Sequence, residues 1–233
     1  VQSAAAVAVA GILLLAGWQY VPGPWRATAA DRYGATALEA FRRGDDIHDQ
    51  TALKVFGPES GLDRHELRRR AKIVNYALLY GKTAFTLAKD IGVSQAAAQQ
   101  FIDAYFAGFP RVRGFIEQTL EDGRKTGVVR TMFGRKRPVP ELNSTNGRVR
   151  AEAERMAVNM PIQGTAADIL KLAMIAVHQS LSSIPTARMI LTVHDELLFE
   201  VAEAHADATA ALVRERMQNA ATLNVPLTVD VGI

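Results

Sequence analysis

The chain has no cysteine among its 233 residues, which excludes a disulfide scaffold and a thiolate metal site. None of its five histidines occurs with the His-x-x-x-His spacing of a zinc-binding helix, so we expect no zinc site. The net charge is only +3, and a surface that binds nucleic acid would therefore have to be a local patch. The length allows one large domain or two small ones, with a sizeable core in either case.

The first 30 residues differ in composition from the rest of the chain. Ala4 to Trp18 is almost wholly apolar, but it is shorter than the roughly 20 residues that a membrane-spanning helix needs. No Lys or Arg precedes it, whereas a secretory signal sequence begins with cationic residues. We expect a buried strand or helix here, and a signal sequence or a membrane anchor are the alternatives.

Beyond this segment the pattern is mostly helical and then mixed. Hydrophobic periodicity and capping residues predict helices over 31–56, 63–80, 83–91, 94–107, 110–125, 148–159 and 204–223. Pro161 is expected to interrupt the helical pattern, and Thr165 with Asp168 resembles a capping box that restarts a helix running to 182. Strands are expected over 128–133, 189–193, 197–201 and 226–231. Strands packed beside long helices, after a mainly helical part, predict an α+β fold.

The helix over 63–80 carries a stripe of functional interest. Arg68, Lys72, Tyr76 and Tyr80 follow one another at four-residue intervals and share one helix face. Arg and Lys one turn apart can bind a polyphosphate, and a tyrosine one turn further on offers a flat face for a base or sugar. The alternative is a solvated basic helix whose tyrosines help to pack the core.

The polar stretch 124–150 holds eight Lys or Arg residues and a single acid, Glu141. Glycine, proline and asparagine between these cations predict turns and loops. Cations carried on such loops are typical of contact with a phosphate backbone, which is independent of base sequence. A solvated surface is the alternative.

A His-Asp-Glu triplet interrupts two apolar segments near the end of the chain. The lengths of 189–193 and 197–201 leave room for only a tight hairpin turn at His194, Asp195 and Glu196. Two adjacent carboxylates repel each other unless a cation lies between them, and carboxylate oxygens suit Mg²⁺. The alternative is an ordinary solvated turn with two acids.

Three motifs in this order resemble one known family. They are Arg68-x-x-x-Lys72-x-x-x-Tyr76-x-x-x-Tyr80-Gly81, Arg155-x-x-x-Asn159-x-Pro161-x-Gln163-Gly164-Thr165-Ala166-Ala167-Asp168, and Val193-His194-Asp195-Glu196. From about Ala37 onward the chain resembles the C-terminal half of a family A DNA polymerase of the bacterial DNA polymerase I type. Phage-type RNA polymerases are similar, but they tend to have methionine at the position of Tyr76 and His-Asp-Ser in place of His-Asp-Glu.

The resemblance implies a role for each residue that matches a family motif. Arg68 and Lys72 would grip the β- and γ-phosphates of the incoming nucleotide, and His48 would be a further phosphate contact. Tyr76 would stack on the nucleotide, and Tyr80 would pack near the templating base. Family members with a tyrosine at the position of Tyr76 accept dideoxynucleotides readily, so we expect weak discrimination against these chain terminators.

The resemblance also implies contacts to DNA and to metal. The residues that would touch primer and template near the growing end are Arg155, Asn159, Gln163 and His194. Asp195 would be one of two carboxylates that hold two catalytic Mg²⁺ ions, and Glu196 would be a supporting acid beside it. The expected catalytic residues are therefore Asp195, Glu196 and Lys72, and Lys72 would act on the leaving group.

The chain departs from the family pattern at its first carboxylate motif. Family members carry the segment Asp-Tyr-Ser-Gln-Ile-Glu-Leu-Arg before the helical part called the fingers, which holds the nucleotide-binding helix. No such segment occurs in this sequence. An ungapped count from His48 places Gln19 and Pro24 at the two acidic positions, and neither can replace a carboxylate ligand. We therefore expect a fragment with an incomplete second metal site and doubtful activity on its own. A non-catalytic nucleotide- and DNA-binding remnant of the same fold is the alternative.

The resemblance finally implies an architecture and a setting. It implies a fragment of the right-hand polymerase fold, with helical fingers over 31–131 and a palm over 132–233 that has a small antiparallel sheet and long helices. Residues 1–30 have no match. The expected partners are primer-template DNA and deoxynucleoside triphosphate (dNTP), and the expected state is a cytoplasmic monomer without a membrane.

Overall fold

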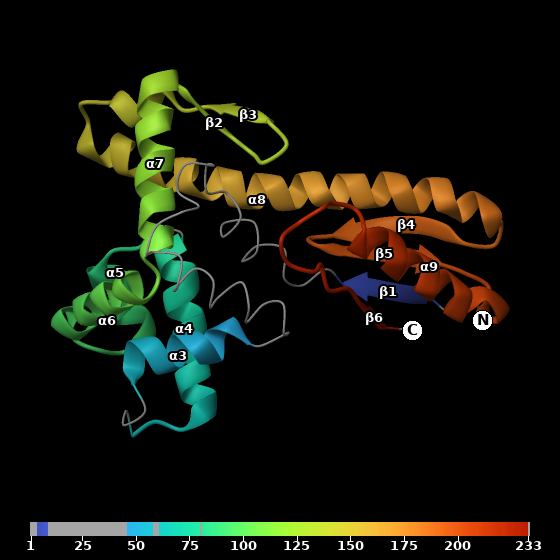
Figure 1. The fold of residues 1–233 in the computed structure, drawn as a ribbon, viewed down its shortest axis with the longest axis horizontal. Helices are drawn as coiled ribbons and strands as arrows, with labels where there is room; N and C mark the ends of the chain where they lie inside the picture. Colours follow the sequence, from blue (N-terminus) through green and yellow to red (C-terminus); the bar gives the residue numbers. More distant parts are fainter. Residues whose placement is uncertain (1–3, 9–45, 58–60, 80, 233) are drawn as a thin grey trace. The chain divides into compact units, whose positions relative to one another are not determined.

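The computed structural model describes residues 4–8, 46–57, 61–79 and 81–232, and the chain divides into two compact units (Figure 1). One unit combines Val1–Gln19 with Ile162–Ile233, and the other is Tyr20–Pro161. We call them the sheet unit and the helical unit. The expected boundary between fingers and palm at residue 131 is a boundary between functional parts, whereas these two units are defined by their compactness. The boundary at residue 131 stays a prediction.

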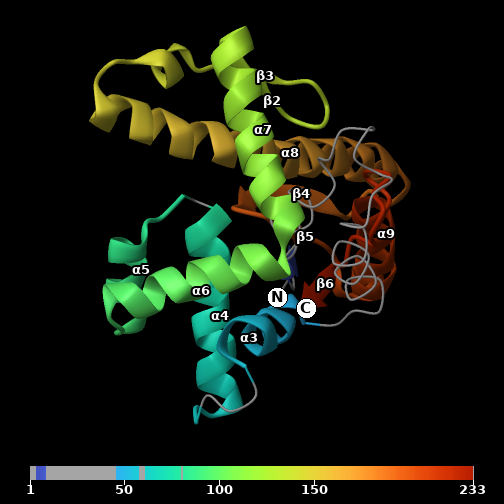
Figure 2. The same ribbon diagram turned by 60° about the vertical axis from the view of Figure 1, so that its left-hand side comes forward.

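Five helices begin the described part of the helical unit, and their positions agree with the periodicity of the sequence (Figure 2). They are α3 (Ile47–Phe56), α4 (Arg64–Leu79), α5 (Ala84–Ile91), α6 (Gln95–Gly108) and α7 (Pro110–Thr126). Asp46, Thr83 and Ser94 cap α3, α5 and α6 by accepting hydrogen bonds from backbone N–H groups of the first turn. The predicted helices are therefore confirmed within the described residues, and 31–45 lie outside them.

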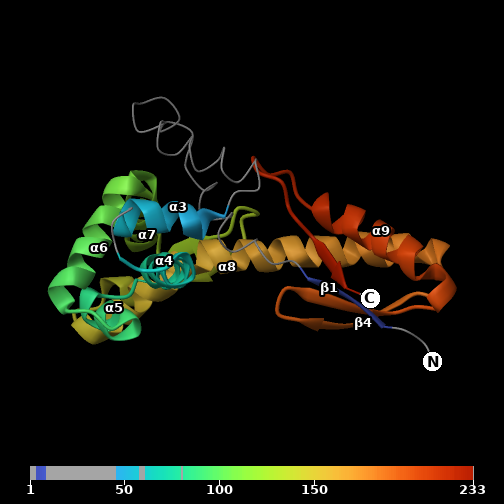
Figure 3. The same cartoon turned by 90° about the horizontal axis from the view of Figure 1, so that it is seen from below.

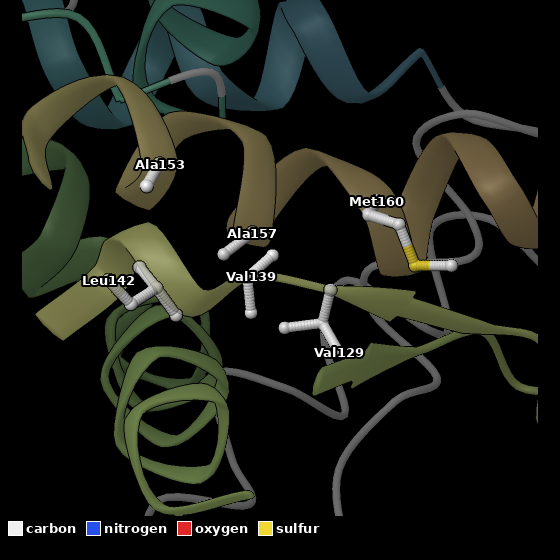
Figure 4. Packing of buried hydrophobic residues seen from close by; sticks show 6 residues of the cluster. All are labelled: Val129, Val139, Leu142, Ala153, Ala157 and Met160. Carbon is white, nitrogen blue, oxygen red and sulfur yellow. The ribbon is translucent and has the colours of Figure 1, made fainter. Parts of the chain in front are cut away.

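A small hydrophobic core packs the segment that follows α7 against the next helix (Figure 4), and the partly buried Leu120 of α7 packs against this core. Strands β2 (Val128–Arg130) and β3 (Lys136–Pro138) form an antiparallel hairpin, and the 3-10 helix η2 (Pro140–Asn143) follows. Val129, Val139 and Leu142 pack there against one face of the next helix. The approach is so close at Gly123 that an added Cβ would lie 2.7 Å from Leu142 Cδ1. This packing fixes the base of the hairpin within the cationic stretch 124–150. Turns and a strand over 128–133 are expected there, and the observed strand ends at Arg130.

The next helix, α8 (Gly147–Ser180), corrects one expectation (Figure 1). The predicted interruption at Pro161 and the restart at Thr165 are wrong, because a single helix of 34 residues runs through both positions. A proline removes one intrahelical hydrogen bond. Burial of the flanking Val158 and Ile162, and of Pro161 itself, holds the backbone helical across that gap.

The span Gly147–Ser183 is, among the described residues, the one helical segment long and apolar enough to cross a membrane by length and composition. This is weak evidence, because 44% of its most apolar window is buried inside the structure and the core helix of a globular fold passes the same test.

The sheet unit is built on a four-stranded antiparallel sheet with the order β4-β5-β1-β6 (Figure 1). Figure 3 shows β1 and β4 of this sheet from another side. Its strands are β1 (Ala4–Ala8), β4 (Arg188–Val193), β5 (Glu196–Glu200) and β6 (Asp230–Gly232). A buried strand or helix is expected over 4–18, and the structure shows a strand at 4–8 that pairs with both β5 and β6. The remainder of the expected segment up to residue 30 lies outside the described residues.

One strand is shorter than expected, and one helix completes the sheet unit. Val225, Leu227 and Val229 alternate with exposed residues, which imitates a strand, but ladder pairing starts only at Asp230. Helix α9 (Ala206–Gln218) lies against β1 and β6, and the 3-10 helices η3 (Leu181–Ser183) and η4 (Glu203–His205) connect the elements. The fold is α+β, as the sequence predicts.

Candidate functional site

The cationic stripe of α4 lies on the surface of the helical unit. Ala71, Val74 and Leu78 are buried on an adjacent side of this helix, whereas Arg68 and Lys72 are exposed. The predicted stripe therefore reaches the surface at Arg68 and Lys72, and Tyr76, which follows on the same helix face, is half-buried. Tyr80 lies outside the described residues.

Arg68 is held by an acid from the neighbouring helix. Its Nε donates to Asp46 Oδ2 over 2.7 Å, and its second guanidinium nitrogen approaches the same oxygen at 2.6 Å. The Asp46 carboxylate also accepts from the backbone N–H of His48 at 2.8 Å. Burial raises the pKa of Asp46, but the hydrogen bonds from Arg68 and His48 outweigh it and the net pKa lies below the ordinary value. A triphosphate that binds Arg68 must therefore share it with this carboxylate.

His48 lies in the first turn of α3 and is buried next to α4. Asn75 Nδ2 hydrogen-bonds to its Nδ1 over 2.9 Å, and the ring of Tyr76 lies 6.2 Å away between centroids. Burial lowers the pKa of His48, and the positive charges of Arg68 and Lys72 lower it further against the opposing effect of Asp46. The imidazole is accordingly a neutral group beside two cations.

The end of α4 contacts the predicted DNA-binding side of α8. Gly81 adopts a positive φ of 66°, and Lys82 N donates to Ala77 O over 2.8 Å, which closes the helix as the sequence predicts. A Cβ at Gly81 would lie 3.2 Å from Cγ of Arg155. The exposed Arg155 side chain therefore lies close to the C-terminal end of α4.

Asn159 lies one turn further along α8. Its Oδ1 is buried, and within the described residues it has no hydrogen-bond partner. A buried amide oxygen without a partner costs free energy unless a water molecule or a ligand satisfies it. This atom thus suits a polar ligand group.

The hairpin tip of the sheet unit carries the predicted acids. Val193 pairs with Glu196, so the loop consists of His194 and Asp195 alone. His194 has φ 55°, the one positive φ outside glycine among the described residues. Asp195 is half-buried, whereas Glu196 is exposed. A strained two-residue turn fixes the aspartate at the end of the strand.

The hairpin tip supplies too few donors to hold a metal ion by itself. Within the part of the chain that the structure describes, no group of three or more His, Asp or Glu side chains could hold a metal ion. Mg²⁺ is often held by one or two carboxylates together with substrate phosphates. Asp195 and Glu196 are two carboxylates of this kind, and the described residues supply no third ligand group.

The predicted residues fall into two groups. His48, Arg68, Lys72 and Tyr76 lie together in the helical unit, whereas Gln163, His194, Asp195 and Glu196 belong to the sheet unit. Gln163 is exposed on α8.

Asn75 was missed by sequence reasoning. It follows Ala71 by four residues and precedes Leu78 by three, so helical spacing places it on the buried face. A polar residue at a buried helical position is the signal that could have identified it.

Similarity to known proteins identifies the family. A family model described as DNA polymerase family A matches residues 32–233. The chain belongs to DNA polymerase family A. It is 49% identical over 193 residues to the thermostable DNA polymerase I of Thermus filiformis, and 50% identical over 197 residues to one from Thermus thermophilus. The matches cover 83% and 84% of this chain, but only 23% of each relative.

A solved polymerase-domain structure is also similar to this chain. It is described as the POL domain of Pol1 from M. smegmatis in complex with DNA primer-template and dNTP, and it is 38% identical to this chain. The TM-score is 0.86, and the match covers 99% of this chain and 39% of that one. The predicted family and the predicted fold class are therefore confirmed.

Proposed function

We propose that this chain carries the nucleotide-binding and catalytic parts of a template-directed DNA polymerase, acting in DNA replication or repair. Its reaction joins the primer 3′-oxygen to the α-phosphorus of a dNTP and releases pyrophosphate. Primer-template DNA and dNTP are the partners, and we propose a cytoplasmic monomer that does not require a membrane. The observation that carries the proposal is the exposed pair Arg68 and Lys72, next to Tyr76 and His48 on a family A scaffold.

The helical unit supplies the nucleotide-binding groups in this proposal. Arg68 and Lys72 bind the β- and γ-phosphates and stabilise the charge that develops on pyrophosphate. His48 contacts a phosphate, Tyr76 stacks on the nucleotide, and Tyr80 packs near the templating base. Cations on the leaving group act where negative charge grows during the reaction, so they lower the barrier as well as the dissociation constant.

The groups that bind DNA come from both units. They are Arg155, Asn159, Gln163 and His194. The exposed guanidinium of Arg155 suits a phosphate of the DNA backbone. The side-chain oxygen of Asn159, which has no partner among the described residues, suits a donor on the nucleic acid. The turn at His194 holds its ring next to Asp195, where the primer end would lie.

Asp195 would hold a divalent ion, with Glu196 as the supporting acid beside it. When bound, Mg²⁺ at two positions lowers the pKa of the primer 3′-hydroxyl and neutralises charge on the departing pyrophosphate. The second position in this proposal is incomplete, because the first carboxylate motif of the family has no counterpart in the sequence.

Primer extension with Mg²⁺ tests the catalytic proposal. The parent chain should extend a primer, Asp195→Ala should lose extension, and Asp207→Ala, an exposed aspartate in the first turn of α9, should behave as the parent does. Equal background with all three chains would contradict catalysis.

The absence of the family's first carboxylate motif from the sequence favours a second candidate function. In this alternative the chain binds nucleotide and DNA but does not polymerise. Primer extension separates the two, because it occurs only in the first. Equilibrium titration tests the binding that they share, since Lys72→Ala should weaken dNTP binding in both cases. Lys125→Ala is the matched control, since this exposed lysine pairs with Glu121 of its own helix.

A further inference from the structure

Asn75 connects α4 to α3 through both ends of its amide. The side chain is 3% exposed, and it faces Thr51, which is fully buried, and His48, which is 7% exposed. Thr51 Oγ1 donates to Asn75 Oδ1 over 3.1 Å, and Asn75 Nδ2 lies 2.9 Å from His48 Nδ1. All three residues belong to the helical unit.

This chain of contacts determines which ring nitrogen of His48 carries the proton. The Thr51 hydroxyl hydrogen occupies the amide oxygen of Asn75, so the NH₂ end is the end left for His48. An NH₂ group donates, and Nδ1 must then accept. A neutral imidazole has one N–H, and when Nδ1 accepts, that hydrogen is on Nε2.

The position of that hydrogen matters for a phosphate ligand. Phosphate oxygens accept hydrogen bonds and do not donate them at neutral pH, so they bind an N–H and are repelled by a ring lone pair. With the hydrogen on Nε2, the edge of His48 that is turned away from Asn75 is a donor. Arg68 and Lys72 already supply positive charge, and the imidazole adds a directed neutral donor beside them.

We propose that Asn75 is a positioning residue which holds His48 in the Nε2–H tautomer, so that the ring donates a hydrogen bond to a phosphate oxygen of the incoming nucleotide. The inference rests on the proposed nucleotide-binding function of His48. In a purely structural role, Asn75 would only join α3 to α4, and the tautomer of His48 would not affect nucleotide binding.

The tautomer is measured directly by long-range ¹H–¹⁵N NMR on the ¹⁵N-labelled full chain, with the His48 signals assigned by their loss in His48→Gln. The expected pattern is that of the Nε2–H form. A Nδ1–H form, or equal amounts of the two tautomers, would overturn the proposal. This measurement requires no nucleotide and no catalysis.

Thr51→Val removes the hydroxyl that orients the amide and keeps the shape of the side chain. Asn75 can then turn around, and we expect a measurable population of the Nδ1–H tautomer together with weaker dNTP binding. Thr119→Val is the matched control, because Thr119 is also buried in the helical unit and its hydroxyl has no partner among the described residues. This control should change neither the NMR pattern nor the affinity.

Titration with dNTP then tests the positioning role of Asn75 separately from the nucleotide-binding function. His48→Ala and Asn75→Ala should each weaken binding by about tenfold, the effect typical of a lost hydrogen bond to a charged group, and the double variant should lose little more. If His48→Ala weakens binding and Asn75→Ala does not, the positioning role is wrong while the proposed function stands. If the parent chain binds no dNTP, the proposed function and the phosphate contact both fail, even where NMR finds the Nε2–H form.

Discussion

Arg68 and Asp46 form an ion pair between α4 and the start of α3, with two guanidinium nitrogens within 2.7 Å of one carboxylate oxygen. This pair places a counter-charge on a cation that we propose to bind triphosphate. The side chain of Arg68 is still 45% exposed, so solvent screens the pair and a phosphate can reach the guanidinium. Nucleotide binding and the ion pair therefore compete for the same group.

Replacing the acid tests this competition. Asp46→Asn should strengthen dNTP binding by up to about fivefold, because an exposed ion pair contributes about 0.2–1 kcal/mol and asparagine caps a helix as well as aspartate does. Equilibrium titration measures the change. Asp49→Asn is the control, since Asp49 pairs with Arg64 instead. Weaker binding in Asp46→Asn would show that the acid orients Arg68 productively.

His48 gives the stability of the chain a predictable dependence on pH. Burial, together with Arg68 and Lys72, lowers its pKa below the ordinary 6.5, so the unfolded chain takes up the proton first as the pH falls. The free energy of unfolding should thus decrease as the pH falls from about 6.5 toward the lower pKa of the folded chain. Urea denaturation of the parent and of His48→Gln across this range measures the effect. An unchanged pH slope in His48→Gln would contradict the assignment.

The turn at His194 combines backbone strain with a proposed DNA contact. His194→Gly should raise the free energy of unfolding by about 1 kcal/mol relative to His194→Ala, because glycine adopts positive φ without a steric cost. Both variants lose the ring, so both should bind primer-template DNA more weakly than the parent. Denaturant titration and DNA binding measure the two effects separately. Equal stability of the two variants would mean that the turn is not strained.

Gly81 tests the contact between the end of α4 and Arg155. Gly81→Ala places a Cβ at positive φ and 3.2 Å from the arginine, whereas Gly92→Ala has nearly the same φ and open space around it. Both should lose about 1 kcal/mol from backbone strain, and Gly81→Ala should lose more. Arg155→Ala in the Gly81→Ala background should remove the difference. Denaturant unfolding measures all four chains, and equal costs for the two alanines would show that Arg155 moves aside freely.

Tyr76 tests the proposed nucleotide site through its choice of substrate. If its hydroxyl stands in for the missing 3′-hydroxyl of a dideoxynucleotide, Tyr76→Phe should discriminate against chain terminators more strongly than the parent does. Competition between dNTP and the matching dideoxynucleotide, in primer extension or in binding, measures the ratio. Equal discrimination by the two chains would count against this role.

The sequence alone predicted most helices, the hairpin and the family. The four-residue spacing from Arg68 to Tyr76 places these side chains on one face of any regular helix, so their grouping needs no tertiary information. The hairpin at His194 was equally local, because two apolar strands leave only a short turn between them. Local rules failed at Pro161, where packing of Val158 and Ile162 holds one helix together across a residue that ordinarily ends one.

Only the tertiary structure showed how residues distant in sequence act on one another. Asn75 lies 27 residues from His48, and Asp46 lies 22 residues from Arg68. No periodicity within one helix shows which side chain a neighbouring helix places against it. The sequence therefore determined which chemical groups α4 presents, because side-chain direction along a helix is local. The packing of α3 on α4 decided which groups are neutral, paired or oriented, because burial and hydrogen bonding depend on the neighbour.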